Sequence, residues 1–411
     1  MMALSVAVLF ISLLATRGES SRWFLFIGWS EHNGDSFMDF FNSVVNTHQN
    51  PYDVKVIYPA ICSVIHKLLY FMIRPVDFGG TVTDPTSPAQ PTEIKLYQSF
   101  MLTYIIFMLV FFVLFFFALN ALMKKSGNGE KSVMAFFCLL SAPFLFLIDR
   151  GNIMGLSLAF AMLFMAYYDH ERKLIRELAF ICLALSISIK IYPAIFAVLL
   201  LNEKRYKDFI KTVIYTVIVF FGPFIFFGGI SGAFKFVKNL FSTSANSFLS
   251  IDLQLSFQKF PVYIGYIFGS ESDVWAVIGV VMMISFAVLG FFCSLISKTR
   301  WKTCAICTCL LVGVPAMSAR YALMFFIIPI ILMFMEEREN KWFSYLSLVI
   351  MGAMMFVKPL LFWGLSENSR YFGYKADSFL YIGFFVILCI DAIVQFARHK
   401  RVAAGQSREV A

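Results

Sequence analysis

Charged residues are scarce in this chain of 411 residues: 14% of them are Asp, Glu, Lys or Arg, whereas 60% are hydrophobic and 18% aromatic. Soluble globular domains carry about 25% charged residues, so this composition excludes an ordinary soluble protein. No Gly-rich or Ser-rich linker, low-complexity tract or internal repeat divides the sequence. We therefore predict a single membrane-embedded domain, 1–411.

Further absences narrow the class of protein. The formal net charge is +9, but no basic face interleaved with aromatic residues is present, so we expect no nucleic-acid partner. The eight cysteines lie mostly inside apolar runs, which indicates no disulfide framework. Cys304, Cys307 and Cys309 have a metal-like spacing without a nearby His, so we expect neither a metal nor a cofactor. The apolar stretch 2–16 has no basic leader, and we interpret it as the first span.

Apolar runs recur along the whole chain, and each needs about 20 residues to cross about 30 Å of hydrocarbon. Polar breaks rich in Lys and Arg are predicted to face the cytoplasm: 124–131, 169–177, 202–208, 298–302, 336–341 and the tail from Arg398. Breaks that are longer on average and poorer in Lys and Arg for their length are predicted to lie outside: 17–96, 149–152, 229–273 and 365–377. Single crossings are then expected at 97–122, 132–148, 153–168, 209–228, 274–296, 342–364 and 378–397.

Two apolar stretches, 178–201 and 303–335, begin and end on the predicted cytoplasmic side. Each must enter the membrane and return, and 178–201 leaves about 11 residues, or about 16 Å, for each leg. Breaks suited to a turn occur at 190–193 and at 315–320. The sequence thus predicts an all-α polytopic membrane protein with about 12 membrane segments, two short hairpins among them, and both termini in the cytoplasm.

Each hairpin tip carries a cation, Lys190 in the first and Arg320 in the second. Backbone that leaves a helix at membrane depth must be satisfied by protein or by a water-filled cavity, so we expect both tips to line one polar cavity. Charges at this depth are functional candidates by default. The alternatives are snorkelling of the side chain to the interface or a structural ion pair.

The predicted first outer loop, 17–96, contains two carboxylates four residues apart, Asp35 and Asp39. A helix over 35–45 would place both on one face. Repulsion between like charges raises the proton affinity of one carboxylate, which suits a general base. Asp35 can alternatively cap the helix.

Two outer-loop segments have the pattern of helices that lie along a membrane surface. One is the apolar stretch ending at Ile73, which His66 and Lys67 interrupt. The other has apolar residues at helical spacing beside two lysines. Its residues are Phe234, Val237, Leu240 and Phe241, with Lys235 and Lys238.

Five segments occur in the order GDSFMDFF (34–41), NPYD (50–53), IYPA (57–60), DRGN (149–152) and SIKIYPAIFAVLLL (188–201). Together they resemble the polyprenyl-phosphate-dependent mannosyltransferases of glycosyltransferase family 87, in the C-type (GT-C) membrane superfamily. The second half departs from that family. A His often precedes Tyr where this chain has Arg320 before Tyr321, and Ala60 replaces the second Pro of Tyr-Pro-Pro.

The resemblance implies a GT-C-like fold with its catalytic carboxylate in the first outer loop, at Asp39 or Asp35. Asp39, followed by Phe40, matches the Asp-Phe element of the family, and the resemblance therefore favours Asp39. The implied reaction is inverting transfer of a hexose, mannose above others, from a polyprenyl-phosphate donor to a lipid-linked or glycan acceptor outside the cytoplasmic membrane. We expect Lys190, Arg320 and Arg150 to bind the donor phosphate, and Tyr58, Asn152 and Tyr192 to bind substrate.

Several alternatives stay open at this point. Asn152 can orient a sugar hydroxyl or equally cap the following span. A flippase for lipid-linked sugars would also use broken helices, although the long outer loop with paired carboxylates does not suit a flippase. A glycan polymerase would share the outer loops and the cationic clusters.

Overall fold

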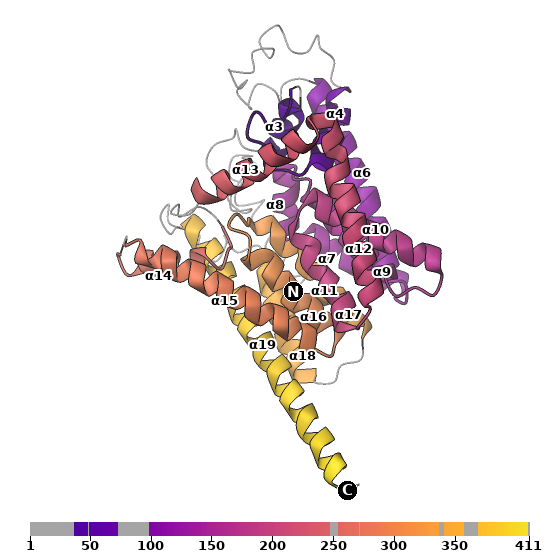
Figure 1. Cartoon of the computed structure of the whole chain (residues 1–411), viewed down its shortest axis with the longest axis vertical. Helices are drawn as coiled ribbons and strands as arrows, with labels where there is room; N and C mark the ends of the chain where they lie inside the picture. The colour runs from indigo at the N-terminus through magenta and orange to yellow at the C-terminus, as the bar shows by residue number, and fades with distance from the viewer. Residues whose placement is uncertain are drawn as a thin grey trace. The chain divides into compact units, whose positions relative to one another are not determined.

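The computed structural model describes residues 37–47, 49–72, 98–246, 254–270, 272–336, 341–356 and 369–409. Every regular element in these ranges is a helix (Figure 1), and the ranges contain no strand. The all-α class is therefore confirmed for the described chain. The predicted first span 2–16 and Asp35 lie outside the described residues.

Internal contacts divide the chain into two compact units, each described separately below. Unit 1 consists of Met1–Pro193, Lys211–Asn246 and Val357–Arg370, and unit 2 of Ala194–Ile210, Ser247–Phe356 and Tyr371–Ala411. The single-domain organisation stays a prediction.

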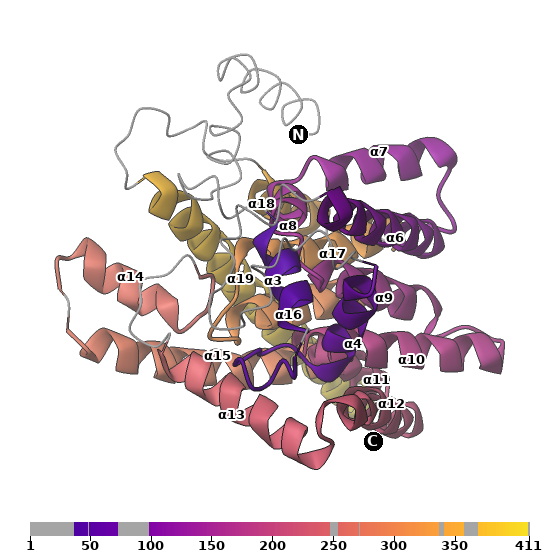
Figure 2. The same ribbon diagram turned by 90° about the horizontal axis from the view of Figure 1, so that it is seen from above.

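Unit 1 is built around a short helix that is apolar on every side. This helix, α9 (Met154–Tyr167), packs between α6 (Gln98–Leu122) and α10 (Lys173–Ile189) (Figure 2). Gly155 allows the close approach to α6, because a Cβ there would lie 2.6 Å from the Phe111 ring. The other unit 1 helices are α3 (Met38–Asn46), α4 (Ala60–Tyr70), α7 (Asn128–Leu139), α8 (Ala142–Arg150) and α13 (Ile230–Asn246).

Unit 2 has its own buried helix, α16 (Arg300–Gly313). It packs against α15 (Val274–Ile296), α17 (Ile327–Met335) and the 3-10 helix η4 (Arg320–Phe326). The unit also contains α11 (Val198–Asn202), α14 (Lys259–Ile267), α18 (Lys341–Met355) and α19 (Ser369–Glu409). Three elements cross a boundary between the units: η2 (Tyr192–Ala197), α12 (Tyr206–Phe221) and α19.

Four of the described helical segments are long and apolar enough to cross a membrane: Met101–Leu122, Tyr206–Phe227, Val274–Ile296 and Ala376–His399. The Tyr206–Phe227 segment joins α12 to the 3-10 helix η3 (Gly222–Phe227). The pair α7 and α8 would form a fifth span if it is counted as one. This chain is thus a polytopic helical membrane protein, whereas the total of 12 segments stays a prediction.

Both predicted hairpin breaks are interruptions of helix in the structure. Helix α10 ends at Ile189, and Lys190 is extended with φ −140° and ψ 127°. Helix α16 ends at Gly313, and regular structure resumes only at Arg320. The contact between α16 and α17 agrees with a chain that turns back there.

The predicted crossing 132–148 corresponds to a bent pair of helices in the structure. Helices α7 and α8 are bent by 60° relative to each other. Ser141 lies between them in an extended conformation, and a proline occupies the first turn of α8. Proline favours the first turn of a helix because its missing N–H is not needed there, so Pro143 starts a new helix.

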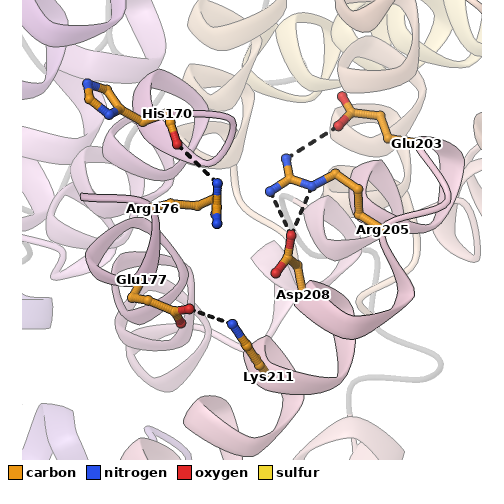
Figure 3. Close-up of polar contacts among 7 residues, drawn as sticks. All are labelled: His170, Arg176, Glu177, Glu203, Arg205, Asp208 and Lys211. Atoms are coloured by element: carbon orange, nitrogen blue, oxygen red, sulfur yellow. Dashed lines mark hydrogen bonds and ion pairs between the residues drawn. The ribbon is translucent and has the colours of Figure 1, made fainter. Parts of the chain in front are cut away.

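Two cations near the start of α12 are held by carboxylates from two predicted cytoplasmic clusters, 169–177 and 202–208 (Figure 3). In unit 1, Lys211 on α12 contacts Glu177 on α10 at 2.5 Å. In unit 2, Arg205 bonds to Asp208 through two guanidinium nitrogens at 3.0 and 2.8 Å. These pairs tie the start of α12 to its surroundings.

Candidate active site

The Asp39 carboxylate stands in the first turn of α3, within unit 1. Phe37, which precedes the helix, has a left-handed conformation with φ 66°. Its N–H donates to the Asp149 carbonyl at 2.5 Å. The predicted helix over 35–45 is therefore wrong at Phe37, whose backbone bonds to the Asp149–Asn152 turn instead of continuing a helix.

Two side chains of that turn hold the Asp39 carboxylate. Arg150 bonds to Oδ1 at 2.5 Å and the Asn152 amide donates to Oδ2 at 2.6 Å. The Arg150 and Asp39 side chains are 13% and 18% exposed. Hydrogen bonds between charged groups are stronger than neutral ones, so the carboxylate is fixed in position while part of its surface stays accessible.

Asn152 plays two parts at once. Its Oδ1 accepts the backbone N–H of Met154 at 2.9 Å, beside the start of α9, while its Nδ2 bonds to Asp39. The bond to Met154 lies close to the predicted capping role, although Ile153 is the N-cap of α9, and the predicted contact with a sugar hydroxyl stays a prediction. The bond to Met154 also settles which end of the Asn152 amide faces the carboxylate.

Gly151 makes the turn between Arg150 and Asn152 possible. Its φ is +63°, a conformation that costs other residues about 1–2 kcal/mol. A Cβ at this position would lie 2.7 Å from the Cβ of Phe40 on α3. A glycine is therefore needed for the turn to approach the helix that carries Asp39.

Tyr58 and Lys190 adjoin the carboxylate. Asn152 Nδ2 lies 3.4 Å from the Tyr58 hydroxyl, and the Lys190 ammonium lies over the Tyr58 ring, 4.2 Å from its centroid. Tyr192 is farther, with its ring centroid 6.0 Å from the same ammonium. Burial raises the pKa of Tyr58 well above its usual value, and the Asp39 charge raises it further. The hydroxyl thus stays a neutral hydrogen-bonding group.

A model of glycosyltransferase family 87 matches residues 94–318, more than half of the chain. The chain belongs to glycosyltransferase family 87. No curated protein and no solved structure matches it. The family model includes Arg150, Asn152 and Lys190, whereas Asp39 and Tyr58 precede the matched region.

Membership confirms the resemblance found in the sequence and makes this chain a glycosyltransferase. The roles of individual residues stay predictions. Within unit 1 the structure brings six of the eight predicted site residues to one place. They are Asp39, Tyr58, Arg150, Asn152, Lys190 and Tyr192.

Contacts that the sequence did not indicate hold these parts of the glycosyltransferase together. The Cys62 thiol on α4 donates to the Ile189 carbonyl at 3.1 Å, which joins α4 to the end of α10 beside Lys190. The Tyr104 hydroxyl on α6 donates to the Ile148 carbonyl at 2.7 Å. No local pattern marks such bonds, because their partners are far apart in sequence.

Helix α13 supports the loop that carries Tyr58. Asn239 on α13 donates to the Tyr52 carbonyl at 2.9 Å, and the Tyr52 ring stacks on Phe224 with centroids 5.3 Å apart. The opposite side of α13 exposes Phe234 and Phe241. The predicted amphipathic helix is thus present, and its contact with a membrane surface stays a prediction.

Arg320 belongs to unit 2 and is buried there. Its Nε bonds to Asp377 on α19 at 2.9 Å, and the two side chains are 2% and 0% exposed. A structural ion pair was one of the alternatives for this cation, and this contact favours it. Donor-phosphate binding by Arg320 and substrate binding by Tyr192 stay predictions.

Proposed function

We propose that this glycosyltransferase moves a hexose, most simply mannose, from a polyprenyl-phosphate donor to a lipid-linked or glycan acceptor at the outer face of the cytoplasmic membrane. The observation that carries the proposal is the Asp39 carboxylate, which Arg150 and Asn152 hold beside Lys190 in a family 87 chain. The donor, the sugar and the membrane face come from the family resemblance and from the charge pattern.

Asp39 is the proposed general base. As the acceptor hydroxyl oxygen bonds to the anomeric carbon, its proton moves to the carboxylate of Asp39. The bond from the anomeric carbon to the phosphate oxygen breaks, and its electron pair leaves with the lipid phosphate. Attack opposite the leaving group inverts the anomeric configuration. Two hydrogen bonds to Asp39 keep the carboxylate oriented for the transfer.

The leaving phosphate gains negative charge and needs fixed cations. Lys190 and Arg150 are the proposed groups, because both lie in the cluster around Asp39 and Tyr58. A guanidinium has five N–H donors, so Arg150 has the capacity to bond to Asp39 and to a phosphate oxygen together. Tyr58 would then keep the Lys190 ammonium in place through its ring.

The test uses membranes that contain the full chain, incubated with radiolabelled polyprenyl-phosphate mannose or polyprenyl-phosphate glucose. We expect one donor to yield a labelled lipid or glycan product. Asp39→Asn should lower the rate by about 10²–10⁴, as expected for loss of a general base. Asp53→Asn is the matched control, because Asp53 is a half-exposed carboxylate of the same loop, paired with Lys235.

Full activity of Asp39→Asn would refute the role of Asp39. If wild-type membranes consume neither donor, the proposed donor class is wrong. Movement of the donor across vesicle membranes without cleavage would instead identify a flippase. Elongation of a product by repeated units would identify a polymerase.

A further inference from the structure

A groove in unit 2 is lined by none of the predicted site residues. It has a volume of about 720 Å³ and is formed by the first turn of α18 together with one face of α19. Its lining residues on α19 recur every three or four positions, which places them on one side of the helix. They are Ile387, Ile390, Asp391, Val394, Gln395 and Arg398.

The groove carries excess positive charge. Lys341 and Arg398 line it, and no carboxylate among the described residues pairs with either. Asp391 also lines it, but its Oδ2 is 2.7 Å from the ammonium of Lys302. The Asp391 side chain is 18% exposed and that of Lys302 is 6% exposed, so this pair is largely neutralised inside the protein.

The remaining wall is apolar and open to the surroundings. Ile390 is 56% exposed and Val394 is 41% exposed. Both belong to the candidate membrane span Ala376–His399, and Arg398 lies at its end. Trp342, on the opposite wall, is 85% exposed, and tryptophan favours the interface between a membrane and water.

We propose that this groove binds an anionic phospholipid. Its phosphate would lie between Lys341 and Arg398, and one acyl chain would follow Ile390 and Val394 along the membrane-facing side of α19. A soluble anion would satisfy the two cations but would make no contact with the apolar wall. A lipid satisfies both, because headgroup charge and acyl chain occupy the ends of one molecule at the depth where the span ends.

Native mass spectrometry of the purified full chain tests this proposal with dioleoyl phosphatidylglycerol and dioleoyl phosphatidylcholine as probes. We expect tighter binding of phosphatidylglycerol. The double variant K341A/R398A should bind it about 10- to 30-fold more weakly, because each cation near an anionic headgroup contributes about a factor of five. Affinity for phosphatidylcholine should change less than threefold.

R172A/K207A is the matched control. It removes the same charge from two exposed positions of other predicted cytoplasmic clusters. Equal weakening in both double variants would overturn the proposal, as would equal binding of the two lipids by the wild type. A photoactivatable phosphatidylglycerol gives a second measurement on the unmodified chain. It should label peptides from α18 and α19, and labelling confined to other helices would also overturn the proposal.

Discussion

The ion pair between Arg320 and Asp377 is buried deeply enough for a sharp test of its energy. Their side chains are 2% and 0% exposed, and the Nε to Oδ2 distance is 2.9 Å. Removal of one partner takes away a close opposite charge from the other, in a medium that solvates a charge poorly. We expect Asp377→Leu and Arg320→Met each to lower the free energy of unfolding by about 3–5 kcal/mol.

The double variant R320M/D377L should behave differently. Hydrophobic side chains of similar volume often replace a buried ion pair with no loss of stability, so we expect a change within about 1 kcal/mol of the wild type. The two single losses sum to about 6–10 kcal/mol, and the coupling energy between the positions should therefore be several kcal/mol.

SDS titration in mixed micelles, followed by circular dichroism, measures these free energies. The control cycle uses Asp53 and Lys235, whose side chains are 51% and 47% exposed, and should give a coupling below about 1 kcal/mol. Additive effects of the Arg320 and Asp377 substitutions would refute the reasoning. Transferase activity of the stable double variant also decides the role of Arg320: retained activity indicates a structural residue, and lost activity supports phosphate binding.

Three further predictions concern unit 1. Gly151→Ala should destabilise the chain by more than about 1 kcal/mol, because φ is +63° and the new Cβ meets Phe40. Gly129→Ala, in α7, has open space and should not lower stability in SDS titration, because alanine favours a helix more than glycine does. Asn152→Ala should lower kcat/KM of the transfer about 10- to 150-fold through loss of one charged hydrogen bond, and an unchanged value would exclude a positioning role. Burial lowers the pKa of the His66 imidazole from 6.5 to about 4. As pH falls, the unfolded chain therefore binds a proton at this residue before the folded chain does. The free energy of unfolding should then decrease by up to about 3 kcal/mol between pH 6.5 and pH 4. His66→Leu should remove this component, and an unaltered pH dependence would contradict it.

Long apolar runs with charged flanks were the most predictable part of the fold. The crossing expected at 274–296 coincides with α15, and that at 97–122 differs from α6 by one residue. The hairpin breaks were predictable too, because consistent placement of the basic clusters requires the chain to turn near Lys190 and near Arg320. In each case the prediction rests on the free-energy cost of burying a charge or an unpaired backbone group in the membrane, which limits where a span can begin, end or turn.

The bend between α7 and α8 was missed although Pro143 marks it. Hydropathy averaged over 132–148 does not register a change of helix axis, whereas Pro143 lies in the second half of that run, where a proline breaks or bends a helix. The start of α3 was missed for a different reason. Phe37 leaves the helical conformation to bond with Asp149, more than a hundred residues away.

Composition and spacing alone indicate a helical membrane protein, and they mark the polar residues whose burial in a membrane is costly. Lys190, Arg320 and Asp39 stand out from composition and position. The partners of these residues become known from the packing of the helices: Asp39 with Arg150 and Asn152, and Arg320 with Asp377. Hydropathy is a property of each segment, whereas the pairing of charges depends on which segments pack together, and that choice follows from side-chain shapes across the whole unit.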